Sequence, residues 1–133
     1  MTERVAATGT KVTGVWVATA LLTVVFLLSG GTKLAGNQMH IDNFLRWGYP
    51  DWFRLVVGTI EVGSALLLLL PRAAPYAAAA LLVTMIGAVG THIVASEVPM
   101  AVAPAILGAL AAWVGRRRLA VAYHGENRLP RSG

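Results

Sequence analysis

Three ionisable side chains stand in otherwise apolar stretches of the sequence and are the residues best placed to carry chemistry. Lys33 ends one apolar stretch, Glu61 lies inside a second and His92 lies near the end of a third. A carboxylate within hydrocarbon must pair with a cation, take up a proton or face a polar interior, because a bare charge there costs at least about 2.5 kcal/mol. Lys33 is the expected partner of Glu61, and the imidazole of His92 is a candidate proton donor or acceptor. The residues predict either an ion pair that fixes helix register or a site for a ligand or a proton relay.

The elements that position these side chains are predicted to be membrane-spanning helices. Of the 133 residues, 56% are hydrophobic and only 13% are charged, whereas roughly a quarter of the residues in a soluble domain are charged. Four stretches are long enough to cross a hydrocarbon layer about 30 Å thick, and they cover residues 12–32, 52–70, 75–96 and 99–115. We expect an all-α integral membrane protein with an antiparallel four-helix transmembrane bundle over residues 1–118. Residues 119–133 are expected to form a disordered cytoplasmic tail.

The distribution of basic residues predicts that both termini are cytoplasmic. With four spans, eight lysines and arginines fall on the side of the termini: Arg4, Lys11, Arg72, Arg116, Arg117, Arg118, Arg128 and Arg131. The opposite side holds three: Lys33, Arg46 and Arg54. Because basic residues concentrate on the cytoplasmic side of membrane proteins, the richer side is assigned to the cytoplasm. Lys33, Glu61 and His92 are then expected in the outer half of the bilayer.

The longest connection between spans, residues 33–51, predicts a short interfacial helix in the first extracytoplasmic loop. Apolar residues recur there at helical spacing, at Ile41, Phe44, Leu45 and Gly48. Such a helix lies on the membrane surface with its apolar face down. It either shields the outer end of the bundle or forms a vestibule over a site between the helices. The vestibule candidates are Phe44, Arg46, Trp47 and Tyr49.

Several classes of site are excluded by composition and spacing. The chain contains no cysteine, so disulfides, thiolate metal sites, iron–sulfur clusters and cysteine nucleophiles are ruled out. No nucleotide-binding loop or catalytic serine motif is present. His40 and His92 match no standard spacing of metal or haem ligands, so no metal is expected. The basic residues stand at the ends of apolar stretches, where they encode topology, and so they do not predict nucleic-acid binding.

Four segments resemble the DoxX-like family of small four-span bacterial membrane proteins: SGGTKLAG, FLRWGYPDWF, GTIEVGSALLLLLPR and MIGAVGTHI. The resemblance covers about residues 15–115. Its most specific positions are Ser29, Gly30, Lys33, Leu34, Gly48, Tyr49, Pro50, Gly58 and Glu61. The family takes its name from a membrane subunit associated with thiosulfate:quinone oxidoreductase. The resemblance therefore implies a bacterial cytoplasmic membrane protein associated with a redox complex, either quinone-linked or active in oxidative and thiol stress.

The functional hypothesis that follows is an accessory subunit of an oxidoreductase rather than an autonomous enzyme. Without cysteine or a recognisable redox motif, the chain cannot move electrons through its own side chains. A redox role would require either a bound quinone, held without a covalent link, or a membrane or peripheral protein partner. A second copy of the chain is another expected partner. Lys33, Glu61 and His92 would then be the ligand-binding or proton-relay residues. Two alternatives stay open, namely a non-enzymatic scaffold or assembly factor and a small proton-coupled transporter.

Overall fold

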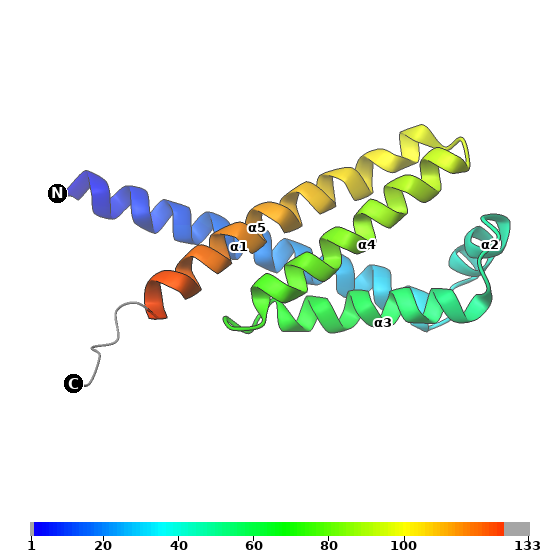
Figure 1. Cartoon of the computed structure of the whole chain (residues 1–133), viewed down its shortest axis with the longest axis horizontal. Coiled ribbons are helices and arrows are strands. Elements are labelled where there is room, and N and C mark those ends of the chain that lie inside the picture. The colour runs from blue at the N-terminus through cyan, green and yellow to red at the C-terminus, as the bar shows by residue number, and fades with distance from the viewer. Residues whose placement is uncertain (1, 127–133) are drawn as a thin grey trace.

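The computed structural model describes the backbone of residues 2–126 and the side chains of residues 12–124, and Figure 1 shows this part of the chain as packed helices. The elements are α1 (Thr2–Leu34), α2 (Gln38–Arg46), α3 (Asp51–Leu67), α4 (Ala74–Val94), the 3₁₀ helix η1 (Val98–Ala101) and α5 (Val102–Glu126). No strand occurs among the described residues. The all-α fold class is confirmed.

Local sequence explains where the helices begin and end. The side chain of Asn37 caps α2 by accepting a hydrogen bond from the amide of Met39 at 3.0 Å, which satisfies a donor that the first turn leaves free. Pro50 is extended immediately before α3, as its missing amide favours. Pro75 occupies the first turn of α4. After α4, Ser96 adopts a φ of 60°, and this left-handed residue turns the chain back toward η1.

The helices pack as two pairs, which contact each other through α3 and α4 and through α1 and α5. α1 crosses α3, and α4 runs beside α5 in the opposite direction, while α3 also contacts α4 (Figure 1). The tightest apolar core lies toward the end of the bundle away from α2, where Leu22, Leu68, Leu81 and Val114 are completely buried. Burial of these side chains holds the pairs together, and it leaves the α2 end of the bundle for polar residues.

Three helical segments are long and apolar enough to span a membrane, namely Val12–Leu34, Ala74–Val94 and Val98–His124. Their outward faces carry large apolar side chains; Leu28 is 64% exposed, Val83 69% and Val94 88%. Such faces suit contact with lipid. α3 has 17 residues, or about 25 Å at 1.5 Å per residue. This helix also contains the buried residues Arg54 and Glu61.

Two expected boundaries are corrected by the structure. The second apolar stretch was expected to be helical through residue 70, but α3 ends at Leu67 and Leu69 and Leu70 donate to carbonyls three residues back. This tightening precedes Pro71, whose ring disfavours helical backbone in the residue before it. The chain after Arg118 was expected to be disordered, but α5 continues to Glu126. Leu119, Ala120 and Ala122 are good helix formers and favour this extension. Residues 127–133 of that tail lie outside the described residues.

Candidate functional site

A close crossing of α1 and α3 brings together the central residues of the site. A Cβ added at Gly30 would lie 2.8 Å from the carbonyl oxygen of Gly58, and one added at Gly58 would lie 3.0 Å from the carbonyl oxygen of Gly30. Because glycine has no side chain, the two backbones can approach this closely. Lys33 and Glu61 each follow one of these glycines by three residues, so both emerge beside the crossing.

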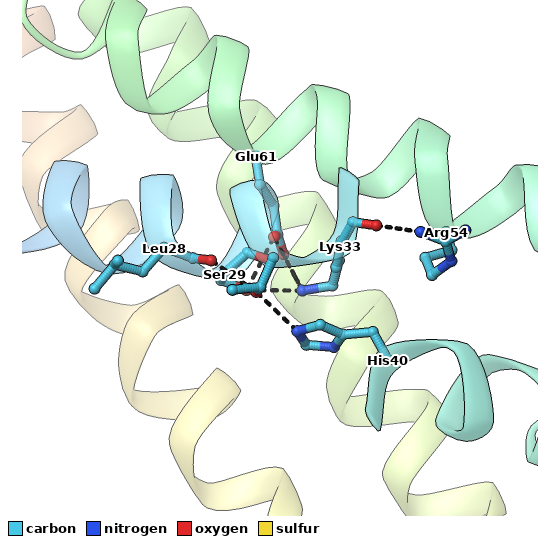
Figure 2. Close-up of polar contacts among 7 residues, drawn as sticks. Leu28, Ser29, Lys33, His40, Arg54 and Glu61 are labelled. Carbon is cyan, nitrogen blue, oxygen red and sulfur yellow. Dashed lines mark hydrogen bonds and ion pairs between the residues drawn. The ribbon is translucent and has the colours of Figure 1, made fainter. Parts of the chain in front are cut away.

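Lys33 and Glu61 form the ion pair that the sequence predicted. Lys33 Nζ lies 3.0 Å from Glu61 Oε2 and 3.4 Å from Oε1, and the two side chains are 11% and 3% exposed. Ser29, one turn before Lys33, completes the cluster (Figure 2): its Oγ accepts from Lys33 Nζ at 2.7 Å and donates to Glu61 Oε2 at 3.0 Å. The buried charges thus neutralise each other and are hydrogen-bonded, as burial in a low dielectric requires.

Arg54 adds a second buried cation to the α1 and α3 crossing, and sequence analysis did not assign it to the site. Its guanidinium donates to the backbone carbonyl of Lys33 and to the carboxylate of Asp51, with Nη2 of Arg54 lying 2.9 Å from Asp51 Oδ1. Lys33 stands in the last turn of α1, where carbonyls lack partners within the helix. Arg54 therefore supplies a hydrogen-bond donor to a backbone carbonyl at the end of α1, and it holds in place the helix turn that carries Lys33.

His92, which sequence analysis placed with Lys33 and Glu61 as a ligand-binding or proton-relay candidate, does not join the ion pair. Its Nδ1 lies 3.0 Å from Glu97 Oε2 instead. The reason is the reversal at Ser96, which folds Glu97 back against the last turn of α4; the Glu97 amide even donates to the His92 carbonyl at 2.7 Å. A reversal of this kind depends on backbone conformation, so helical spacing alone did not reveal the pair.

Glu97 links α2 to the end of α4. Its carboxylate pairs with the Arg46 guanidinium through Oε1 and accepts from Trp47 Nε1 at 3.3 Å through Oε2. The Trp47 and His92 rings meet edge to face, with their centroids 5.2 Å apart. Arg46 was expected to line a vestibule, but its side chain is 53% exposed and is absent from the cavity wall. Its long side chain extends to Glu97 because opposite charges attract across the short gap between the two segments.

Beneath α2 lies a cavity of about 480 Å³, within the range of small-molecule sites. Most of its wall is apolar, contributed by α1, α3, α4 and α5. The polar side chains that line it are Ser29, Lys33, His40, Asn43, Tyr49, Glu61, Thr84, Thr91 and His92. Lys33, Glu61 and His92 therefore share one cavity although His92 does not contact the other two. Their role in ligand binding stays a prediction.

An aromatic cluster forms the α2 side of this cavity. Phe44, Trp47 and Tyr49 all line it, as does Phe53, so these vestibule candidates are brought together with the ion pair. The ring of Phe44 lies 5.4 Å from Trp47, 5.9 Å from Tyr49 and 6.2 Å from Phe53, centroid to centroid, in tilted arrangements. Phe44 is 6% exposed. Tilted aromatic packing of this kind holds α2 over the cavity.

His40 of α2 is a further residue of the cavity wall, and it approaches the ion pair from the opposite side to α3 (Figure 2). Its Nε2 lies 3.0 Å from Thr32 Oγ1. Burial lowers the pKa of His40 from its ordinary value of 6.5, and the positive charges of Lys33 and Arg54 lower it further. The imidazole is accordingly neutral at pH 7. No group of three or more potential metal-binding side chains occurs in the described part of the chain.

Some of the residues that sequence analysis missed carried usable signals. Ser29 stands one helical turn from Lys33, and a serine four residues before a buried lysine is within reach of its ammonium group. Arg54 stands one turn inside α3 beside two other charges, Asp51 and Glu61. Glu97 is the sole carboxylate between the last two apolar stretches. The position of His40 depends on the fold of the loop and had no comparable signal.

The chain was also compared with known proteins. No curated protein and no solved structure matched it. The model of the DoxX-like family matches residues 17–114, a range that contains both glycines of the helix crossing, the ion pair, Glu97 and every residue of the cavity wall. Because the match extends over most of the sequence, the chain belongs to the DoxX-like family.

Proposed function

We propose that the chain is a four-span membrane protein in which α3 spans the membrane together with the three longer segments, Val12–Leu34, Ala74–Val94 and Val98–His124. α3 is shorter than the other spans, but it packs on α1 and α4, and its polar residues Arg54, Glu61 and Ser64 are buried against protein and not exposed to lipid. Both termini are then cytoplasmic, as the eight-to-three distribution of basic residues favours. α2 lies at the outer interface, where Leu45, 74% exposed, and Met39, 59% exposed, contact lipid.

The function that the site supports best is binding of a lipid-soluble amphiphile of the quinone class. The observation that carries this proposal is the cavity of about 480 Å³, whose wall is mostly apolar and whose polar groups gather around a buried ion pair and an aromatic cluster. An apolar pocket with a few convergent polar groups suits a ring with oxygen substituents. Apolar side chains also line the wall contributed by α4 and α5, and this favours a ligand that partitions from lipid.

We place this binding function in an accessory subunit of a redox complex in the bacterial cytoplasmic membrane. The chain has no cysteine, so electrons would reach the ligand from a partner protein. Resemblance to quinone-linked proteins supports the same assignment. In this role the chain holds the ring and its protonatable partners, and the partner supplies the redox centre.

A quinone-analogue titration in lipid nanodiscs tests the proposal, with Ala88→Leu as the variant that fills the cavity. Ala88 lines the cavity on α4, whereas Ala79 of the same helix is exposed and does not line it. Ala79→Leu is therefore the matched control for added volume. We expect decylubiquinone to bind the wild type and Ala79→Leu with equal affinity, and to bind Ala88→Leu at least tenfold more weakly.

Two results would contradict the binding proposal. If no variant binds while thermal melts show that all are folded, the ion pair has only a structural role. If Ala88→Leu binds as tightly as the wild type, the ligand occupies another surface. Either result would favour the second candidate function, a scaffold or assembly factor. The observation in its favour is that Lys33, Ser29 and Glu61 already satisfy one another.

A further inference from the structure

The hydrogen bond between Thr32 and His40 fixes which imidazole nitrogen carries the proton. Thr32 Oγ1 lies 2.7 Å from the carbonyl oxygen of Leu28 and 3.0 Å from that of Ser29. A carbonyl can only accept, so the single hydroxyl proton of Thr32 is directed to the backbone. His40 Nε2, 3.0 Å from the same hydroxyl oxygen, must be the donor. In the neutral ring Nδ1 then carries a lone pair and acts as an acceptor.

The same argument applies to Tyr49 and Thr91. Thr91 Oγ1 donates to the carbonyl of Gly87 at 2.9 Å, so it has no proton left for Tyr49. The Tyr49 hydroxyl, 2.7 Å away, is therefore the donor, and its proton is used within the protein. What Tyr49 offers to a molecule in the cavity is the lone pair of its oxygen.

The groups around Glu97 follow the same rule. A carboxylate only accepts, so His92 donates through Nδ1, which lies 3.0 Å from Glu97 Oε2. Trp47 uses its one polar proton on the same carboxylate. Thr84 likewise directs its hydroxyl to the carbonyl of Ala80 at 2.8 Å.

The buried ion pair also leaves acceptors and uses its donors. Lys33 Nζ has three protons and three contacts, with Ser29 Oγ and both oxygens of Glu61. Ser29 uses its own proton on Glu61 Oε2. The Glu61 carboxylate has more lone pairs than these three donors occupy. Among the described side chains on the cavity wall, Asn43 keeps its amide protons free of bonds to protein, while its oxygen accepts from Arg46.

Building on the proposed function, we propose that the cavity selects hydroxyl-bearing ligands, so that it binds the reduced, diphenolic form of a quinone-class amphiphile in preference to the dicarbonyl form. A phenol would donate to His40 Nδ1, Tyr49 Oη or Glu61. A quinone carbonyl would face the lone pairs of the same atoms. An acceptor that opposes an acceptor leaves both unpaired, and a site built for a hydroxyl rejects an analogue without one.

The test compares 4-decylphenol with its methyl ether 4-decylanisole, in which a methyl group replaces the hydroxyl proton and removes the donor. Each is titrated into nanodiscs that contain the wild-type protein, and partition into empty nanodiscs is subtracted. We expect the phenol to bind at least tenfold more tightly than the ether. The preference should fall at least threefold in His40→Phe or in Tyr49→Phe, which remove acceptors. His124→Phe, an exposed histidine on α5 away from the cavity, is the matched control and should leave the preference unchanged.

The outcomes separate this inference from the proposed function. Equal binding of phenol and ether, or tighter binding of the ether, overturns the donor preference while ligand binding stands. A phenol preference that survives in both His40→Phe and Tyr49→Phe overturns the assignment of acceptors. Binding of decylubiquinone without binding of the phenol also overturns the inference and keeps the function. If nothing binds to folded protein, both fail. The ratio of phenol affinity to ether affinity in the wild type tests the donor preference even if one variant does not fold.

Discussion

The crossing of α1 and α3 gives the sharpest prediction, because two adjacent glycines of α1 have opposite environments. A Cβ at Gly30 would meet the carbonyl oxygen of Gly58 at 2.8 Å, the Cβ of Glu61 at 2.9 Å and Cγ2 of Val62 at 2.9 Å. A Cβ at Gly31 would meet nothing within 4 Å. Both glycines lie within the same helix and neither has a positive φ. Gly31→Ala is therefore a matched control for Gly30→Ala.

The expected difference in stability follows from these contacts. Alanine favours a helix over glycine by about 1 kcal/mol, and this gain is common to both variants, so it cancels in the comparison. What remains is the cost of overpacking at Gly30, about 1–3 kcal/mol. The upper end applies because one clashing atom belongs to the rigid backbone of α3 at Gly58. We expect Gly30→Ala to be about 3 kcal/mol less stable than Gly31→Ala, a factor on the order of 100 in the unfolding equilibrium.

Reversible unfolding in mixed micelles, followed by far-UV circular dichroism, measures this difference. Gly58→Ala should change stability in the same direction, because its added Cβ would lie 3.0 Å from the carbonyl oxygen of Gly30. If Gly30→Ala and Gly31→Ala unfold at the same denaturant concentration, α1 and α3 do not cross at these glycines. The ion pair that depends on the crossing would then be wrong as well.

Three further predictions concern charge and topology. Removing one partner of the Lys33 and Glu61 pair should cost about 3–5 kcal/mol of unfolding free energy. The double variant Lys33→Gln with Glu61→Gln should cost less than the sum of the two single losses. Additive losses in this double-mutant cycle would show that the two side chains do not interact. The pKa of His40 is lower in the folded state, so its contribution to the free energy of unfolding should be fully present above about pH 6.5 and should be lost as the pH drops through the folded-state pKa. Melting temperatures measured over this pH range should fall less in His40→Gln than in the wild type. An identical fall in both proteins would refute the lowered pKa of His40. Cysteine at Asn37 should react with a membrane-impermeant maleimide on intact cells, and cysteine at Ser132, which lies outside the described residues, should not; the reverse pattern would invert the topology.

The sequence by itself determined the helical fold class, the family resemblance and the pairing of Lys33 with Glu61. These features follow from local composition and from simple depth arguments. A long apolar stretch has few alternatives to a helix in lipid, because every backbone polar group must be satisfied internally. A cation at similar depth is one of the few ways to accommodate a carboxylate in such a stretch, and Lys33 is the nearest candidate in the sequence.

Only the tertiary structure decided how the remaining polar groups pair. His92 binds Glu97 because the chain reverses at Ser96. His40 reaches the cavity because α2 folds back against the end of α1. Arg54 fixes the last turn of α1 across the same crossing. Each of these contacts joins segments whose relative rotation is set by packing, and helical periodicity within one segment carries no information about rotation against another. The direction of each hydrogen bond in the cavity follows from that packing.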